Sequence, residues 1–398
     1  MKKIGFVAPW YGEKIGGGAE AELRGLVHHL AEAGVALEVL TTCAEAFRSD
    51  WSVDFHEPGL TEEAGIPVRR FRVRKRNEWL FEQVNRKLMK GFRVTREEEE
   101  LYCREMVNSP DLYAYIKEHG EEYSLFVFIP YMFGTTYYGC QVHPEKSILI
   151  PCLHDEGYAY MRVFREAFSK VKGMIFHAEP ERALAEKLYG VKGENFPVLG
   201  EGMDTDWTAD AERFRQKTGI REPFILYAGR KEPGKRVDVL AKYFARFRQE
   251  WGKDLKLVLI GGGEVENPDP ENILDLGFVD KQVKQDAYAA AEFFCNPSEM
   301  ESFSIVIMES WLAGRPVLVN GKCAVTRDFA VRANAGLYYG NYAEFAGCAG
   351  YLLEHAEVAA KMGENGNRFV RGNYAWDEIV DKYTKYFERM SEVNAFGY

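Results

Sequence analysis

The chain has 398 residues, of which 46% are hydrophobic, and it carries a formal net charge of -10 at neutral pH. Single hydrophobic cores stop growing near roughly 250 to 300 residues, so this length predicts two domains. The acidic balance, with a pI near 5.5, argues against nucleic acid as a partner, because binding to phosphates needs a basic face.

The seven cysteines are scattered and include no Cys-x-x-Cys pair, a pattern that fits neither a disulfide framework nor a zinc site. The apolar run at the N-terminus is too short for a signal peptide. No later stretch approaches the ~20 apolar residues of a membrane span. We therefore expect a cytoplasmic protein.

Short apolar runs alternate with longer helical patterns along the whole chain, which is typical of βαβ units and parallel sheets. The expected strands are residues 4–8, 36–41, 68–73, 125–129, 147–150 and 173–176 in the first half, and 224–228, 255–260, 273–276, 291–295 and 316–319 in the second. The clearest helical patterns are 19–33, 236–251, 305–313 and an amphipathic closing helix at 376–390. The alternation pauses near 200–204, where we place the linker.

A glycine-rich loop, residues 11–20, follows the first expected strand and includes Gly17 and Gly18. Glycines allow a backbone to approach a ligand closely, although a flexible turn explains them equally well. The Gly-x-Gly-x-x-Gly spacing of dinucleotide-binding proteins is missing, which makes an NAD-dependent oxidoreductase the weakest alternative.

Residues 69–96 are strongly basic within an acidic chain, and apolar side chains such as Trp79 and Phe92 are interleaved with the cations. Such a segment suits an anionic lipid surface, where each cation contributes ~1 kcal/mol. A solvated segment that balances the acidic residues 97–100 is the equal alternative. Peripheral association with the inner face of the cell membrane is therefore one hypothesis.

His154 follows the expected strand 147–150 and could exchange protons or hold a substrate hydroxyl. A structural role is the alternative for a single histidine.

Two further motifs follow strands of the second half. Arg230 and Lys235 lie just beyond strand 224–228, after Gly229, and could bind a diphosphate. Glu301 and Glu309 lie beyond strand 291–295, at the carboxyl edge where parallel sheets bind ligands. A solvated charge cluster and compensation of the helix dipole are the respective alternatives.

Taken together, the glycine loop, the Gly-Arg with its downstream lysine, and Glu-x7-Glu resemble the GT4 family of retaining glycosyltransferases. The resemblance extends over nearly the whole chain and includes Leu276-Gly277-Phe278-Val279 and Ala313-Gly314-Arg315-Pro316-Val317. The family's usual Glu-Gly-Phe-Gly is Glu301-Ser302-Phe303-Ser304 here. The two serines restrict the backbone conformations available near the expected phosphate site. They do not identify the donor sugar.

The resemblance implies an α/β fold of the GT-B class, in which two Rossmann-like domains face each other across a cleft. The implied domains are an acceptor-binding domain at 1–202, a nucleotide-sugar-binding domain at 203–375, and a C-terminal helix at 376–398 that packs back on the first domain.

The resemblance also implies a role for each site residue. Glu301 and His154 would face the reacting sugar, with Arg230 and Lys235 on the diphosphate and Glu309 on the ribose. The remaining donor contacts would be the backbone near Phe303, Ser304 and Ile305, the Gly17-Gly18 loop, and Phe278 and Val279 at the base.

The implied function is retaining transfer of a hexosyl unit from a UDP- or GDP-linked sugar to a glycan or lipid-linked acceptor, in the synthesis of surface polysaccharide or glycoconjugate. No cofactor and no metal are expected. The alternatives are a nucleotide-sugar hydrolase or epimerase of the same fold and a nucleotide-sugar-binding protein without turnover.

Overall fold

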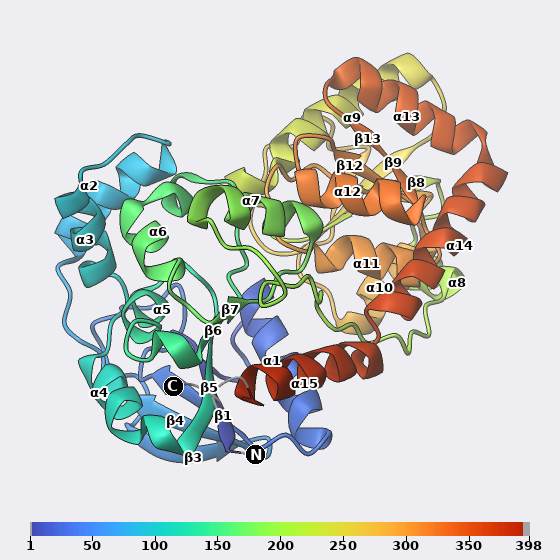
Figure 1. Ribbon diagram of the computed structural model, residues 1–398. Helices are drawn as coiled ribbons and strands as arrows, with labels where there is room; N and C mark the ends of the chain where they lie inside the picture. The colour runs from blue at the N-terminus through green and yellow to red at the C-terminus, as the bar shows by residue number, and fades with distance from the viewer. Residues whose placement is uncertain (1, 393–398) are drawn as a thin grey trace. The chain divides into compact units, whose positions relative to one another are not determined.

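The computed structural model describes residues 2–392 (Figure 1). The chain divides into two compact units: unit 1 comprises Met1–Gly202 and Trp376–Tyr398, and unit 2 comprises Met203–Ala375. The units have the residue limits expected from the sequence, although positions 393–398 of the expected C-terminal segment lie outside the described residues.

Unit 1 contains a seven-stranded sheet in the order β3-β4-β2-β1-β5-β6-β7. Its strands are β1 Lys3–Val7, β2 Leu37–Thr42, β3 Gly59–Glu63, β4 Ile66–Phe71, β5 Tyr123–Phe128, β6 Ser147–Leu149 and β7 Gly173–Met174. All neighbours pair in parallel except β3, which runs antiparallel to β4. The order reverses between β1 and β5, so the loops after these strands diverge and leave room for a ligand.

The helices of unit 1 are α1 Gly18–Glu32, α2 Glu78–Met89, α3 Arg96–Glu105, α4 Pro110–His119, α5 Gly134–Gly139, α6 Arg162–Phe168, α7 Glu179–Tyr189 and α15 Trp376–Glu392. Side-chain caps fix the N-termini of several of these helices. Asn77 and Ser109 cap α2 and α4, and Thr95 forms a reciprocal capping box with Glu98 at α3.

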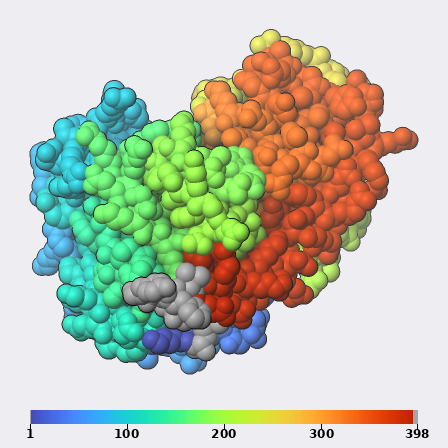
Figure 2. All heavy atoms as spheres, in the orientation of Figure 1, coloured from blue at the N-terminus to red at the C-terminus, as the bar shows by residue number. Residues whose placement is uncertain are grey.

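The closing helix α15 packs against α1 and β5 of unit 1. Its apolar face is buried through Ile379, Tyr383, Phe387 and Met390. In Figure 2 the red atoms of α15 form part of the surface of unit 1. The predicted amphipathic helix, packed back on the first domain, is therefore confirmed.

The first residue of α15, Trp376, fits against two glycines of unit 1. A Cβ atom on Gly25 would lie 2.5 Å from Trp376 Cζ2, and one on Gly202 would lie 2.1 Å from Trp376 Cε3. His29 stacks on the indole with ring centroids 4.2 Å apart. The Trp376 indole therefore packs against both α1 and the residue that ends the first segment of unit 1. Neither glycine position has room for a side chain.

Unit 2 contains a six-stranded, fully parallel sheet in the order β10-β9-β8-β11-β12-β13. The strands are β8 Phe224–Ala228, β9 Lys256–Ile260, β10 Ile273–Asp275, β11 Phe293–Asn296, β12 Val317–Asn320 and β13 Gly336–Tyr339. The helices are α8 Ala211–Thr218, α9 Val237–Trp251, α10 Lys281–Ala290, α11 Ile305–Leu312, α12 Ala324–Ala333, α13 Tyr342–Glu354 and α14 Ala356–Asn373. Here the order reverses between β8 and β11.

The expected strands all have counterparts, within a few residues at their ends, and the prediction of parallel α/β units is confirmed. Two edge strands were not expected. In β3 nearly every side chain is exposed, and β13 is only partly buried, so neither carries the apolar run that marks a central strand. Across the described residues, none of the helices is long and apolar enough to cross a lipid bilayer.

Candidate functional site

The loops after β8 and β11 meet at the carboxyl edge of the unit 2 sheet. The two strands are direct parallel neighbours, with Phe293 paired to Ile225 and Phe294 to Leu226. The loop after β8 carries Lys235 and the loop after β11 carries Glu301, and Lys235 Nζ donates to Glu301 Oε1 at 2.7 Å. The structure therefore brings together two of the predicted site residues.

The loop after β8 has a shape that places Lys235. Gly229 adopts φ 149°, and a Cβ there would lie 3.0 Å from the Tyr227 hydroxyl, so glycine is required. A 3-10 turn, Pro233–Lys235, then leads to Arg236 at φ 55° and into α9. The chain turns at Gly229 and again at the 3-10 turn. These two turns direct Lys235 towards Glu301.

Arg230 lies in the same loop but does not join this ion pair. Its guanidinium is about half exposed and contacts Glu232 Oε1 at 3.4 Å. Lys231, which sequence reasoning passed over, is buried; its Nζ donates to Asp275 Oδ1 at 2.8 Å and to the Gly261 carbonyl at 2.5 Å. Lys231 therefore fixes the loop to the ends of β9 and β10, while Arg230 is accessible to an anion.

Glu309 lies in α11 and is held by two donors from α10. Lys284 Nζ donates to Glu309 Oε1 at 2.5 Å, and the Tyr288 hydroxyl donates to Oε2 at 3.0 Å. Burial and the Glu309 charge raise the pKa of Tyr288 well above its ordinary value, so the hydroxyl stays a donor. Sequence reasoning missed both donors, although their four-residue spacing places them on one face of a helix.

Ser304 adopts φ 75°, a left-handed conformation that glycine prefers, and it is the N-cap residue of α11. Asn296 Nδ2 donates to Ser304 Oγ at 3.0 Å, and both residues are buried. Ser304 thus adopts a left-handed backbone conformation at the position where the GT4 family, which the sequence resembles, has glycine. The first backbone N–H groups of α11 remain available to an anion.

The other predicted residues of unit 2 divide by exposure. The Phe303 ring is buried edge-to-face against Phe329 and Tyr374, at centroid distances of 5.6 and 5.0 Å, so only its backbone can meet a ligand. Phe278 is 90% exposed and Val279 half-buried, just beyond the carboxyl end of β10. Their side chains can therefore be reached by a ligand.

The predicted residues of unit 1 also follow strand ends. Gly17, at φ 153°, precedes α1, and a Cβ there would lie 1.9 Å from Glu20 Oε2, while Gly18 is the first residue of the helix. His154 lies after β6, about one third exposed, with Nδ1 at 3.7 Å from Glu156 Oε1. Glu156 in turn accepts a hydrogen bond from the Tyr131 hydroxyl at 3.0 Å.

A cavity of about 560 Å³ opens in unit 1 beside this histidine segment. Asp155 and Glu156 line it, together with Tyr160. Its remaining wall includes apolar and basic side chains such as Leu88, Phe92, Arg93 and Arg162. The cavity therefore offers both charges and an apolar surface.

Residues 222–355, which include the whole of this unit 2 edge, match the family model described as "Glycosyl transferases group 1". This part of the chain is therefore similar to the group 1 glycosyltransferases. The curated "D-inositol 3-phosphate glycosyltransferase" of Nocardia farcinica is 30% identical over 228 residues, which cover 51% of this chain and 49% of that relative. The chain spans about half the length of the curated relatives it matches.

Solved glycosyltransferase structures match the chain over almost its full length. The sucrose-phosphate synthase of Thermosynechococcus elongatus gives a TM-score of 0.73 at 15% identity, covering 99% of this chain and all of that one. The Anabaena protein Alr3699/HepE, solved in complex with UDP, gives 0.68 at 16% identity and covers 97% of this chain and all of its own. The predicted GT-B fold is confirmed.

The geometry at Ser304 leads to a test of backbone strain. Ser304→Ala keeps a Cβ atom in the left-handed region and loses the hydrogen bond from Asn296, whereas Ser304→Gly loses the bond but relieves the strain. We expect Ser304→Ala to lower the free energy of unfolding of unit 2 by about 1 kcal/mol more than Ser304→Gly. Urea denaturation of both variants measures the difference. An equal loss of unfolding free energy in the two variants would show that the backbone at Ser304 is not strained.

Proposed function

We propose that this protein is a retaining hexosyltransferase that takes its sugar from a UDP- or GDP-linked donor. The observation that carries the proposal is the pair Lys235 and Glu301, joined at 2.7 Å at the switch point of the unit 2 sheet. The match of residues 222–355 to the group 1 glycosyltransferases and the UDP bound to Alr3699/HepE support a nucleotide-sugar donor.

The donor's diphosphate would be bound by positive groups on both sides of the switch point. Lys235 is partly exposed beside Glu301, and the Arg230 guanidinium is accessible. Backbone N–H groups near Phe303, Ser304 and Ile305, at the start of α11, add a partial positive charge. These groups would stabilise the negative charge that develops on the leaving diphosphate.

Glu309 suits the ribose of the donor. Lys284 and Tyr288 each occupy one position on its two oxygens, and a carboxylate has about four lone-pair sites. The 2′ and 3′ hydroxyls of a ribose can therefore donate to the remaining sites. Phe278 and Val279, accessible at the end of β10, would contact the base.

In the proposed reaction, Glu301 accepts hydrogen bonds from the hydroxyls of the donor sugar and acts as a positioning group, not as a covalent nucleophile. The acceptor oxygen attacks on the face from which the diphosphate leaves, and a leaving phosphate oxygen takes the proton. Lys235 and Arg230 supply the charge that a divalent cation provides in other enzymes, so we propose that transfer requires no metal.

The acceptor would be a glycan or a lipid-linked glycan, bound by unit 1 in the synthesis of surface polysaccharide or glycoconjugate. His154 and the Gly17-Gly18 loop would contribute the unit 1 contacts to the donor. The cavity beside His154 supports this assignment, because its charged and apolar walls suit both sugar hydroxyls and ring faces.

Release of nucleoside diphosphate that depends on an acceptor tests the proposed reaction. We expect the wild-type protein to release UDP or GDP from the matching sugar donor when an oligosaccharide or polyprenyl-linked acceptor is added, without added Mg²⁺ or Mn²⁺. The measurement is a coupled nucleotide assay together with mass spectrometry of the product. Equal release without acceptor would identify a hydrolase, and donor binding without product across an acceptor panel would identify a binding protein.

Replacement of Glu301 tests the proposed donor site. Glu301→Gln keeps the shape of the side chain but removes its charge, so we expect kcat to fall by roughly 100-fold, the effect of losing one preorganised contact. Glu299→Gln is the matched control, because Glu299 lies in the same loop but pairs with Arg236 and Lys322. Steady-state kinetics should show near-wild-type turnover for the control, and a similar value for Glu301→Gln would show that the role is misassigned.

The basic segment, residues 69–96, is largely paired with acidic groups of unit 1. Ion pairs join seven of its cations to carboxylates: Arg69–Glu38, Arg70–Glu63, Arg72–Asp54, Arg74–Glu105, Arg76–Glu78, Lys87–Glu98 and Arg96–Glu166. Much of the charge seen in the sequence is therefore neutralised within the fold. In Figure 2 the light-blue atoms of the region around α2 lie at the surface of unit 1.

Beside these pairs, large apolar side chains are exposed on and just after α2. Trp79, Met89 and Phe92 are 68%, 70% and 61% exposed, and the basic residues Lys90 and Arg93 flank Phe92. We propose that this smaller surface rests on the anionic inner face of the cell membrane and brings the enzyme to a lipid-linked acceptor.

Co-sedimentation with phosphatidylglycerol vesicles at low salt tests the membrane contact. The double variant Met89→Ser/Phe92→Ser should bind about 10-fold more weakly than wild type, because two exposed apolar side chains no longer enter the interface. Phe55→Ser is the control, since Phe55 is 59% exposed but lies outside the segment. Absence of wild-type binding, or an equal loss in the control, would refute the contact.

A further inference from the structure

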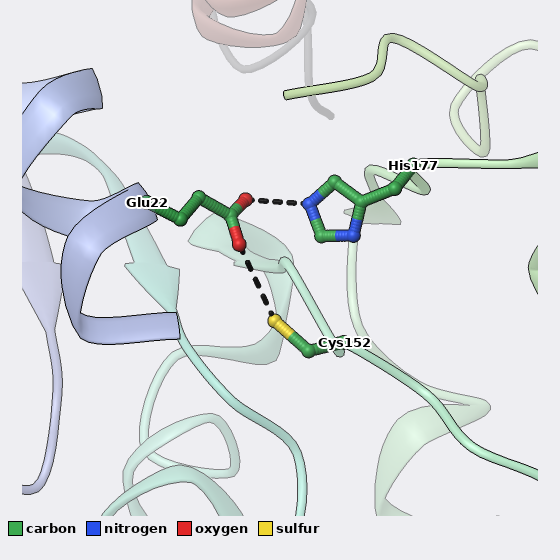
Figure 3. Close-up of side chains that lie close together, drawn as sticks. All are labelled: Glu22, Cys152 and His177. Atoms are coloured by element: carbon green, nitrogen blue, oxygen red, sulfur yellow. Dashed lines mark hydrogen bonds and ion pairs between the residues drawn. The ribbon is translucent and has the colours of Figure 1, made fainter. Parts of the chain in front are cut away.

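Three side chains with different metal-binding atoms converge inside unit 1: Glu22, Cys152 and His177 (Figure 3). Glu22 Oε1 lies 2.5 Å from His177 Nε2, and Cys152 Sγ lies 3.5 Å from Glu22 Oε2. One donor atom of each residue lies within 4.8 Å of the other two. Figure 3 shows the carboxylate pointing between the imidazole and the thiol.

The three residues come from separate elements of the unit 1 sheet and its helices. Glu22 is on α1, four residues beyond the first residue of the helix. Cys152 follows β6 and has φ 50°, and His177 follows β7. Glu22 and His177 are only 5% and 1% exposed, whereas Cys152 is half-buried, so the cluster is shielded from bulk water except beside the cysteine.

A fourth residue, Glu181, orients two of the three segments. Its Oε1 accepts from the Leu153 backbone N–H, next to Cys152, and its Oε2 accepts from the His177 backbone N–H, both at 2.7 Å. Glu181 Oε2 also lies 3.6 Å from His177 Nδ1, while Nε2 faces Glu22. A carboxylate on the ring nitrogen opposite the donor nitrogen is the common second partner of a metal-binding histidine.

The cluster holds more acid than base. Glu22, Glu181 and Glu201 are all buried, and His177 is the basic group among them. Three buried carboxylates around one imidazole favour a cation at this place.

We propose that Glu22, Cys152 and His177 bind one divalent transition-metal ion, with Zn²⁺ as the best match. A thiolate, an imidazole nitrogen and a carboxylate oxygen are the ligand types that zinc accepts. Binding releases two protons to solvent, the one between Glu22 and His177 Nε2 and the thiol proton of Cys152. Coordination to a divalent cation favours the thiolate over the thiol.

The ion has a structural role that goes beyond the proposed sugar transfer. It joins α1, which begins at Gly18, to the segment that leads from Cys152 to His154. Both segments carry residues assigned above to the reacting donor. The ion would fix the positions of these two segments relative to each other without touching the substrate.

Cobalt substitution tests the site directly. The purified full chain is stripped with a chelator and titrated with Co²⁺, which reports both thiolate ligation and coordination number in its absorption spectrum. We expect saturation at one equivalent, with a thiolate-to-cobalt charge-transfer band and the intense visible bands of four-coordinate Co²⁺, in which water is the fourth ligand. Zn²⁺ should abolish these bands by displacement.

Two variants make the assignment specific. Cys152→Ser should lose the charge-transfer band and weaken Zn²⁺ binding at least about 10-fold in competition with a chromophoric chelator. Glu22→Gln should weaken binding but keep the band. Cys348→Ser is the control, because Cys348 is the other half-buried cysteine of the described residues. Absence of the band in wild type, its loss in the control, or unchanged affinity in Cys152→Ser would overturn the proposal.

Discussion

The parallel pairing of β8 with β11 is the constraint on which the candidate site depends. These strands are neighbours in the sheet although α9, β9, β10 and α10 lie between them in sequence, and the sheet order reverses at this point. The loops that follow must therefore leave in different directions from adjacent strand ends. Lys235 and Glu301 meet because this pairing places the ends of their two strands side by side.

The packing of neighbouring elements then holds the site in shape without a ligand. Lys231 fixes the loop after β8 to the ends of two other strands, and Asn296 holds Ser304 at the start of α11. Lys284 and Tyr288 hold Glu309 from α10. The loop after β8, the start of α11 and the Glu309 carboxylate are thus each held by neighbouring side chains, so binding of a ligand need not order them.

Much of this could be read from the sequence. The alternating apolar runs located every central strand, and the motifs after them identified the residues at strand ends. Residues that matter through distant contacts could not be found in this way. Lys231 looks like any loop lysine until its Asp275 partner is known, and Lys284 becomes informative only when α10 is seen beside α11. The edge strands β3 and β13 lack the burial pattern that marks a strand.

The same limit applies to charge. Residues 69–96 read as a basic surface, but their carboxylate partners come from as far as Glu38 and Glu166 and cancel much of that charge.

The lack of paired Cys-x-x-Cys motifs argued against a zinc site. Glu22, Cys152 and His177 are far apart in sequence, and only the folded chain brings their donor atoms within 4.8 Å of one another.

The position of Trp376 has a consequence for biosynthesis. Its indole fills the space beside Gly25 and Gly202, and the helix that it begins covers unit 1. Unit 2 is therefore inserted into the chain of unit 1, as one continuous segment between residues 203 and 375. During synthesis on the ribosome, unit 1 emerges first but stays incomplete, with the apolar groove for α15 uncovered, until the whole of unit 2 has been made. The domain that is translated second is thus the first that can finish folding.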